Sequence, residues 1–413
     1  MKRTNILILI LSFSFLTSVW AQPPVTRPRF GKQGLPLQLQ NVIHEDRGDG
    51  LSIKASEFVK HDLRVWDLGT YPGGSWSWVN DINDFGVVVG WSMISGPDQQ
   101  HPAIISLFGP NALQWVDLGT LGGEAPPGVS AEAFGISDTG IVVGHAFTSE
   151  GSDHAFVWTA RTGMADLGTV PGYLYSQALD INKIGTLIVG WSYTDDPAAP
   201  VLPVYWTPSL EWRQRGPVLT WEMHTLDTTV LGAFPYGTAT AVNNRGQILG
   251  AVWDDSGTTT GVVWSPAGKG WSVKPFYGTA DDPNPWPAEL NDSGEVVGTA
   301  YAADWVHGFA ALWKPVGPRR TYKLVRLPNP WGLSNGDGGI GINNRGDIVG
   351  AAVYDDYGSA RAAYWTTKDP TLVELMPLMD LDWSYSANVN EFGVAAAVIG
   401  GGDVMHGMAV QLH

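Results

Sequence analysis

The sequence predicts an all-β fold, a seven-bladed β-propeller of four-stranded antiparallel blades whose ring is closed by an N-terminal strand. Three observations predict it. A repeat of about 51 residues recurs seven times, and periods near this length are typical of solenoids, propellers and arrays. Each copy holds short apolar runs between turn residues, as strands do. One strand is in excess at the start of the array, and one is missing at its end.

The clearest copy of the repeat runs from Ala131 to Gly168. Its apolar runs are AFGI, IVVGHAF, HAFVW and MADLG, and they are separated by DTG, TSEGSD and TARTG. Gly, Asp, Ser and Thr between apolar runs indicate turns between strands. Each copy is therefore expected to form one four-stranded antiparallel unit.

The most constant feature of the repeat is a turn of Asn, Asp or Ser, two residues, and Gly, as in INDFGVVVG and VNNRGQILG. Asn opens such a turn by bonding the backbone, and Gly supplies a left-handed residue between two twisted strands. We therefore expect a structural role for these residues and positive φ at the glycines, which are Gly86, Gly140, Gly185, Gly246, Gly294, Gly346 and Gly393.

The segment before the repeats has two parts. Met1 to Ala21 has the pattern of a secretory signal peptide, with Lys2 and Arg3 before an apolar run that is too short for a membrane-spanning helix. Residues 22–60 lack the repeat and are expected to form a linker or a strap across the rim. The sequence thus predicts a secreted protein, extracellular or periplasmic, that is monomeric and has no membrane span.

The composition agrees with a secreted all-β protein. Gly 51, Pro 28 and Trp 20 are high, charged residues are only 15%, and Cys 0 leaves stability to burial rather than to disulfides. The formal charge of −16 makes nucleic acid or an anionic membrane a poor partner, because both need a basic footprint.

The strand count predicts how the ring closes. The repeat register begins at His61 with DLRVWDLGT, which is similar to the fourth-strand segments at Val116–Thr120 and Ala165–Thr169. Later fourth strands are expected at LDTTVLG near Leu226 and at three further places, whereas the seventh repeat stops after its third strand, HGMAVQL. An N-terminal strand that completes the last blade of a propeller removes both deficits, whereas an open solenoid leaves both ends uncovered. The propeller is expected to span residues 61–413.

The repeat resembles a known family. DLGT, the IN-x-x-G-x-VVG turn and the triplet His154-Ala155-Phe156 before Trp158 are similar to those of the HAF-repeat family of bacterial repeat proteins. The resemblance covers about Asp62 to His413 and implies a secreted repeat protein. It implies no settled activity, so no catalytic residue follows from it.

The sequence offers no catalytic motif. There is no HExxH, no phosphate-cradling Gly loop and no nucleophile elbow. The recurring His154, His307 and His406 are expected to bond the backbone of a neighbouring loop or strand, and the tryptophans that end the third strands are expected to pack between blades.

Strand topology divides the loops between two faces. Loops after the second and fourth strands open on one face, here called the loop face, and turns after the first and third open on the other, the turn face. The loop face receives acids and irregularly placed aromatic residues. The turn face receives basic residues, namely Arg161, Arg213, Arg215, Lys269, Lys314, Arg319, Arg320 and Lys368, with Lys183, Arg245 and Arg345 in the N-x-x-G turns.

The candidate ligand-binding residues all lie in loops of the loop face or at their strand ends, because aromatic-rich loops on a rigid scaffold commonly carry function. The aromatic candidates are Trp76, Trp78, Tyr173, Tyr175, Tyr236, Trp286, Trp331 and Trp383. The acidic candidates are the pairs Asp195–Asp196, Asp254–Asp255 and Asp355–Asp356, which are also possible Ca²⁺ ligands.

Three hypotheses for function follow from this pattern. The first is a binding module that recognises an extracellular glycan, peptide or protein through the loop face. The alternatives are a polysaccharide hydrolase or lyase and a structural protein of a surface or matrix. Turn-forming Asp and rim-covering aromatics would also give this pattern without any ligand.

Overall fold

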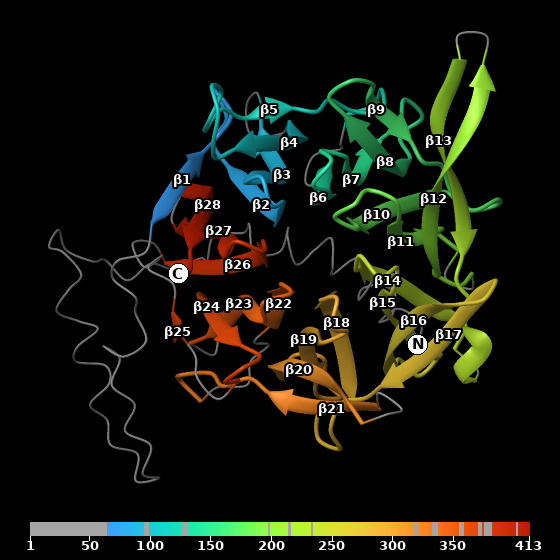
Figure 1. Cartoon of the computed structure of the whole chain (residues 1–413), viewed down its shortest axis with the longest axis vertical. Coiled ribbons are helices and arrows are strands. Elements are labelled where there is room, and N and C mark those ends of the chain that lie inside the picture. Colours follow the sequence, from blue (N-terminus) through green and yellow to red (C-terminus); the bar gives the residue numbers. More distant parts are fainter. Residues whose placement is uncertain are drawn as a thin grey trace, which may run out of the picture.

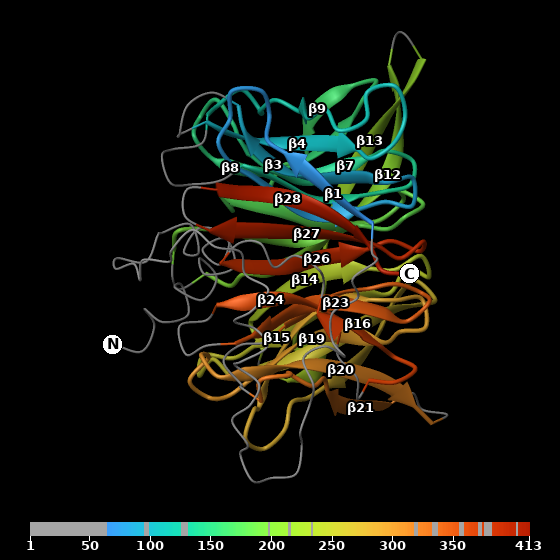
Figure 2. The ribbon, with the colours of Figure 1, turned by 90° about the vertical axis from the view of Figure 1, so that its left-hand side faces the viewer.

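The computed structural model describes residues 64–413 except 95–98, 125–130, 197–198, 214–215, 233, 318–320, 333–337, 355–358, 371–373, 376–381 and 402–403. Seven four-stranded antiparallel sheets stand around a common axis, as Figure 1 shows from above and Figure 2 from the side. The predicted seven-bladed propeller is confirmed. The expected signal peptide, residues 1–21, and the segment 22–60 lie outside the described residues.

The blades follow one another along the chain, each running from its innermost to its outermost strand. The first contains β2 (Ser77–Ile82), β3 (Val87–Met93), β4 (Gln100–Ser106) and β5 (Val116–Asp117). The second contains β6 (Glu132–Ile136), β7 (Val142–Phe147), β8 (Asp153–Thr159) and β9 (Gly163–Asp166). The third contains β10 (Tyr175–Ile181), β11 (Ile188–Tyr193), β12 (Leu202–Arg213) and β13 (Gly216–Thr225), followed by the 3-10 helix η3 (Thr229–Leu231).

The remaining blades repeat this order. The fourth contains β14 (Tyr236–Val242), β15 (Ile248–Trp253), β16 (Thr259–Ala267) and β17 (Gly270–Phe276). The fifth contains β18 (Asn284–Leu290), β19 (Val296–Tyr301), β20 (Gly308–Val316) and β21 (Thr321–Arg326). The sixth contains β22 (Gly338–Ile342), β23 (Asp347–Val353), β24 (Ala360–Thr366) and β25 (Glu374–Leu375). The seventh contains β26 (Trp383–Val389), β27 (Val394–Gly401), β28 (Val404–Gln411) and the N-terminal β1 (Val65–Gly69).

Strand β1 closes the ring as predicted. It pairs antiparallel with β28, with Val65 opposite Val410 and Trp66 opposite Ala409. Trp66 and Leu68 are 8% and 3% exposed and belong to the core between the seventh and first blades. Closure by β1 therefore buries apolar side chains and also pairs the edge of β28, which would otherwise be exposed.

The tryptophans that end the third strands pack between blades, as predicted. Trp206, Trp264, Trp313 and Trp365 are among the largest fully buried side chains. The indole N–H of Trp313 donates to the Tyr277 carbonyl at 2.8 Å, and that of Trp365 donates to the Pro328 carbonyl at 2.9 Å. Each bond joins a third strand to the segment after the fourth strand of the preceding blade, so the same residue fills the core and fixes the neighbouring blade.

The N-x-x-G turns have the predicted backbone, with φ between +71° and +85° at all seven glycines. Their asparagines do more than shape the turn. The Asn390 side chain accepts from the Val394 N–H at 2.9 Å and donates to the Asn83 carbonyl in the next blade at 3.0 Å. Asn83, Asn243, Asn291 and Asn343 make the same bond to the blade that follows each. These bonds link neighbouring blades and cross the point of ring closure.

One predicted fourth strand was wrong. LDTTVLG near Leu226 lies just after the fourth strand of the third blade, which is β13, and includes η3. Strands β12 and β13 form a long hairpin that extends outward from the ring (Figure 1). Extra paired residues in this hairpin displace the fourth strand from the position that the other repeats suggest.

Candidate functional site

The loop face carries a continuous run of aromatic rings across the fourth and fifth blades, here called the aromatic run. Tyr236 stacks on Trp253 with ring centroids 6.1 Å apart and planes 9° apart. Trp253 contacts Trp286 at 6.2 Å, Trp286 contacts Trp305 edge-on at 6.1 Å, and Trp305 contacts Tyr301 at 5.6 Å. Trp253 is buried, whereas the other four rings are half-buried. The buried Trp253 therefore fixes the position of rings that are partly exposed to solvent.

The local fold explains the order of these rings. Tyr236 is the first residue of β14 and lies opposite Trp253, the last residue of β15. Trp305 sits in the short loop between β19 and β20 with φ of +60°, a left-handed conformation that a bulky side chain rarely adopts. Its N–H donates to the Ala302 carbonyl at 3.1 Å, which holds the loop closed. Strained backbone at a loop tip is characteristic of functional sites.

An acid and a histidine stand beside Trp305. Asp304 accepts from the backbone N–H groups of Val306 and His307, and its carboxylate lies 2.5 Å from Nδ1 of His307. These bonds, with the histidine contact first, lower the pKa of Asp304 to about 2. Asp304 therefore stays ionised and available as a hydrogen-bond acceptor at the end of the aromatic run.

The other aromatic candidates fall into smaller groups. The Tyr175 ring contacts the Tyr193 ring with centroids 5.0 Å apart, and its hydroxyl donates to Asp195 at 2.9 Å. Trp331 contacts Tyr354 at 5.7 Å. Trp383 contacts Trp78 at 6.1 Å, but Trp78 is only 5% exposed and lies in the core, with Trp76 packed against the same cluster. Tyr173 is half-buried, and its burial raises the pKa of its hydroxyl.

The acidic candidates are engaged within the protein. Asp254 accepts from the N–H of Ser256 at 2.9 Å and from the N–H of Thr258 at 3.1 Å, so it caps its own loop. Asp255 accepts from the Tyr236 hydroxyl at 3.2 Å, while Asp196 is exposed. Asp355 and Asp356 lie outside the described residues. Within the described ranges, no three His, Cys, Asp or Glu side chains are grouped to hold a metal ion, and the Ca²⁺ hypothesis stays a prediction.

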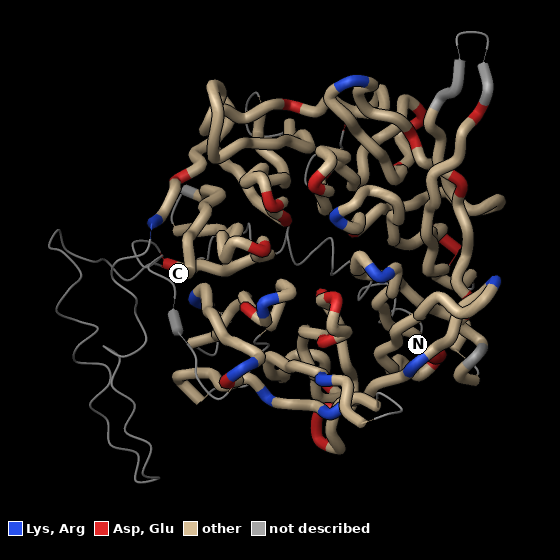
Figure 3. The backbone as a smooth tube through the Cα atoms, in the orientation of Figure 1, with Lys and Arg blue, Asp and Glu red and all other residues tan. Residues whose placement is uncertain are grey.

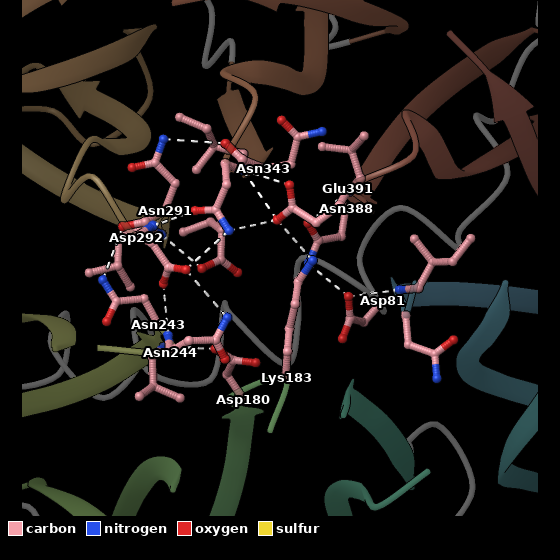
Figure 4. A pocket seen from close by; sticks show the side chains of 18 of the residues that line it. Asp81, Asp180, Lys183, Asn243, Asn244, Asn291, Asp292, Asn343, Asn388 and Glu391 are labelled. Carbon is pink, nitrogen blue, oxygen red and sulfur yellow. Dashed lines mark hydrogen bonds and ion pairs between the residues drawn. The ribbon is translucent and has the colours of Figure 1, made fainter. Parts of the chain in front are cut away.

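The turn face has a pocket at the centre of the ring, lined by the ends of the innermost strands and by the N-x-x-G turns (Figure 4). The residue after the turn Asn or Ser is polar in all seven blades, and we call this set the turn ring: Asp84, Asp138, Lys183, Asn244, Asp292, Asn344 and Glu391. Five of its members line the pocket, namely Lys183, Asn244, Asp292, Asn344 and Glu391. Members of this turn ring bond their neighbours, as when Asp292 accepts from the Asn244 N–H at 2.9 Å. Glu391 likewise donates its own N–H to Asp84 at 2.9 Å.

Lys183 is the basic member of the turn ring. Its ammonium group lies 3.1 Å from a carboxylate oxygen of Asp84 and 2.9 Å from one of Glu391. Burial opposes the charge, but the carboxylates of Glu391 and Asp84 outweigh it together and raise the pKa of Lys183. This ion pair joins the third blade to the first and the seventh across the pocket.

Three acids lie deeper in the pocket, at the ends of alternate inner strands. Asp81 and Asp180 each accept from their own following N–H and from the corresponding N–H of the next blade, which for Asp180 is Val242 at 2.7 Å. The next blade has a small residue at this position, Gly135 after Asp81 and Gly341 after Glu289. A Cβ at Gly341 would lie 2.7 Å from the backbone of Asn388, so the narrow axis requires this alternation.

These deep acids repel one another. Burial raises the pKa of Asp81, and it raises the pKa of both Asp180 and Glu289 well above the usual range. For Asp180 the charge of Asp81 adds to the effect, and for Glu289 the charge of Asp180 does. Figure 3 shows acidic positions around the centre of the ring. The predicted basic turn face is therefore wrong at its centre, where acids outnumber the basic Lys183.

Two sets of residues at these sites were not predicted from the sequence. The first is Tyr193, Trp253, Tyr301 and Trp305, although aromatic residues recur where second strands end. The second is the turn ring with its deep acids, although that ring position is polar in all seven repeats. Aligning the repeats position by position would have exposed both patterns.

The recurring histidines have structural partners, but these are carboxylates rather than the predicted backbone groups, and the partner of His307 is Asp304 in the loop before its own strand. Nδ1 of His154 lies 2.9 Å from Asp166 on the adjacent strand, and Nδ1 of His406 lies 3.3 Å from Asp67 on the closing strand. His101 occupies the equivalent place and contacts Asp117 at 2.9 Å. A His on the third strand and the Asp of DLG on the fourth thus form a structural pair.

Comparison with known proteins supports the fold. No protein-family model matches the chain, and no curated protein matches it in sequence. The β-propeller domain of the Trilobed protease from Pyrococcus furiosus, described as having an open velcro topology, has 9% identity and a TM-score of 0.50 over 82% of this chain and 95% of that chain. Here β1 and β28 pair, so this ring is closed.

Two further solved structures are similar at lower scores. TolB from Acinetobacter baumannii has 12% identity and a TM-score of 0.45, over 71% of this chain and 64% of that chain. The BP39L lectin from Burkholderia pseudomallei has 13% identity and a TM-score of 0.46, over 84% of this chain and 97% of that chain. The chain thus spans less than two thirds of the TolB structure, and these likenesses concern the fold alone. No helix in the described part of the chain is long and apolar enough to cross a membrane.

Proposed function

We propose that this protein is a secreted, extracellular or periplasmic binding module that recognises its ligand through the loop face, without chemistry. Among the loop-face residues, the aromatic run carries the proposal, because half-buried rings packed on the buried Trp253 offer rigid contact area at little cost in conformational entropy. Propellers commonly carry function on such loops, since the blades fix their positions.

Of a glycan, a peptide and a protein, a glycan fits the aromatic run best. Indole and phenol rings can lie against the apolar faces of sugar rings, as they do against other flat apolar surfaces. Asp304 and Asp255 stand at the two ends of the run, where their carboxylates can accept hydrogen bonds from hydroxyl groups. The excess of acids also disfavours an anionic polysaccharide as ligand.

The test is a glycan array probed with the wild-type protein and with Trp305→Ala and Trp286→Ala variants. Removing a dominant aromatic contact typically costs about 2 kcal/mol, or roughly 30-fold in affinity. Trp305 is the safer position, because it lies in a surface loop and its loss leaves the blades intact. Phe85→Ser, a change at a 67% exposed residue of the turn face, is the matched control and should bind like the wild type.

Three outcomes separate the hypotheses. Binding that is lost in Trp305→Ala at unchanged melting temperature supports the proposal. A shortened polysaccharide in the same mixture, detected as new reducing or unsaturated ends, indicates a hydrolase or lyase instead. The absence of glycan binding by the wild type rejects the glycan and leaves a peptide ligand, a protein ligand or a structural role.

A further inference from the structure

Three turn tips on the turn face expose large apolar side chains to solvent. Phe85 is 67% exposed, Phe392 is 63% exposed and Ile184 is 55% exposed. The same turn position is polar or charged in the other four repeats, where it is Thr139, Arg245, Ser293 and Arg345. The apolar tips are thus confined to the first, third and seventh blades.

The ion pair of the pocket brings these tips together. Asp84, Lys183 and Glu391 directly precede Phe85, Ile184 and Phe392. Since Lys183 contacts the carboxylates of both Asp84 and Glu391, the three tips lie around one charged centre, although the residues are far apart in the sequence. We call these three apolar residues and the three charged ones the crown.

More apolar surface lies next to Phe85. Phe108 is 51% exposed, and Leu113 is 45% exposed with φ of +58°. A Cβ at Gly86 would lie 2.7 Å from the Phe108 ring, so this ring packs against the turn that carries Phe85. Contiguous exposed apolar groups of this kind are typical of protein interaction sites.

The charge of the residues around the crown indicates the charge of a partner that could bind there. The turn ring contains Asp84, Asp138, Asp292 and Glu391 against Lys183, which gives a formal charge of −4 + 1 = −3. The tips Arg245 and Arg345, on the fourth and sixth blades, reduce the charge of the seven turns to −3 + 2 = −1, so the acids are in excess beside the apolar tips of the first and seventh blades. A second copy of this chain would bring the same acids to this surface, whereas a cationic segment would complement them. Lys183 itself shows that an ammonium group fits between the carboxylates.

We propose that the crown is a docking surface for a polypeptide segment that carries apolar side chains next to Lys or Arg. The apolar groups cover Phe85, Phe392 and Ile184, and the cationic group lies over the acidic turn ring. This site is on the face opposite the aromatic run and does not depend on the glycan proposal.

The test selects peptides from a random phage-displayed library on the full secreted chain. Synthetic copies of the enriched peptides are then titrated by fluorescence anisotropy. We expect enrichment of aromatic or aliphatic residues beside Lys or Arg, with binding that weakens as salt rises. Phe85→Ser/Phe392→Ser should weaken binding at least about tenfold. The control is Leu174→Ser, at a 47% exposed residue of the loop face, and should leave binding unchanged.

A second variant tests the role of charge with the opposite sign. Lys183→Met changes the formal charge of the turn ring from −3 to −4, so a cationic peptide should bind several-fold more tightly, provided that the melting curve shows a folded protein. The proposal is overturned if enriched peptides are acidic or uncharged, or if no peptide binds the wild type better than the double variant. It is also overturned if folded Lys183→Met binds more weakly, or if only Trp305→Ala abolishes peptide binding.

Discussion

Because β1 closes the ring, removing its buried side chains should destabilise the whole propeller. The substitutions that test this are Leu68→Ala and Trp66→Ala, made separately and together. Both side chains are buried between the seventh and first blades, and the Leu68 carbonyl accepts a 2.8 Å bond from the Trp115 indole. Val65 on the same strand is 37% exposed, so Val65→Ala is the matched control.

The expected cost follows from burial. Leu→Ala in a core typically costs about 2–5 kcal/mol, and Trp→Ala costs about 3–5 kcal/mol. Because the two residues share one cluster, their effects will not add fully. A typical domain has roughly 5–15 kcal/mol of stability, so the double variant should lose a large part of it. Surface substitutions such as Val65→Ala usually change stability by about 0.5 kcal/mol or less.

The assay is urea denaturation followed by tryptophan fluorescence, with limited proteolysis to detect a released β1. We expect lower midpoints for both single variants and early cleavage before Tyr71 in the double variant. Midpoints within error of the wild type for both single variants would refute the closure argument, since β1 would then contribute no core.

The remaining predictions concern the turns and the pocket. Glu289→Gln keeps an acceptor for the Leu290 N–H, seen at 2.8 Å, but removes a buried charge beside Asp180. An acid with a raised folded-state pKa holds its proton more tightly when folded, so stability is lost as pH rises through that pKa. The variant should therefore gain on the order of 1 kcal/mol near neutral pH and show a flatter stability curve toward alkaline pH, whereas a loss at every pH would contradict this.

Asn390→Ser should cost about 1–3 kcal/mol, because it removes the bond to the Asn83 carbonyl while a serine can still cap the turn, as Ser137 does at 3.0 Å. Asn182→Ser is the control, since Nδ2 of Asn182 donates to Thr186 within its own blade, and equal losses in the two melting curves would argue against a blade-linking role. Gly346→Ala should cost more than Gly140→Ala: both have positive φ, worth about 1–2 kcal/mol, but a Cβ at Gly346 would also meet Thr367 Oγ1 at 2.1 Å, whereas nothing lies within 4 Å at Gly140. The reverse order in thermal denaturation would show that contact with Thr367 is harmless.

The sequence was sufficient to predict the architecture because its repeats report local chemistry. The position after each Asn-x-x has a left-handed backbone that favours glycine, and the large apolar tryptophan that recurs in the third strands is buried in the core. Both requirements can be recognised within a single repeat. The spare strand at Val65–Gly69 could be counted before its partner β28 was known. The long β12–β13 hairpin escaped prediction because its extra residues follow no repeat.

The site was harder to predict because it depends on contacts between blades. Trp78 and Trp286 occupy the same position in their repeats, yet one is 5% exposed and the other is half-buried in the aromatic run. The partners of Lys183 lie 99 and 208 residues away in the chain, so no local pattern announces the ion pair. The sequence shows which residues recur, whereas the contacts between residues of different blades are visible only in the three-dimensional structure.

Hydrogen–deuterium exchange in the presence and absence of the glycan that binds best on the array tests the central claim most directly. We expect slower exchange in the loop from Ala302 to His307 and at the start of β14, where the aromatic run lies, with no change at the N-x-x-G turns. Protection confined to the turns around Asp84, Lys183 and Glu391, with the loop at Trp305 unchanged, would contradict it.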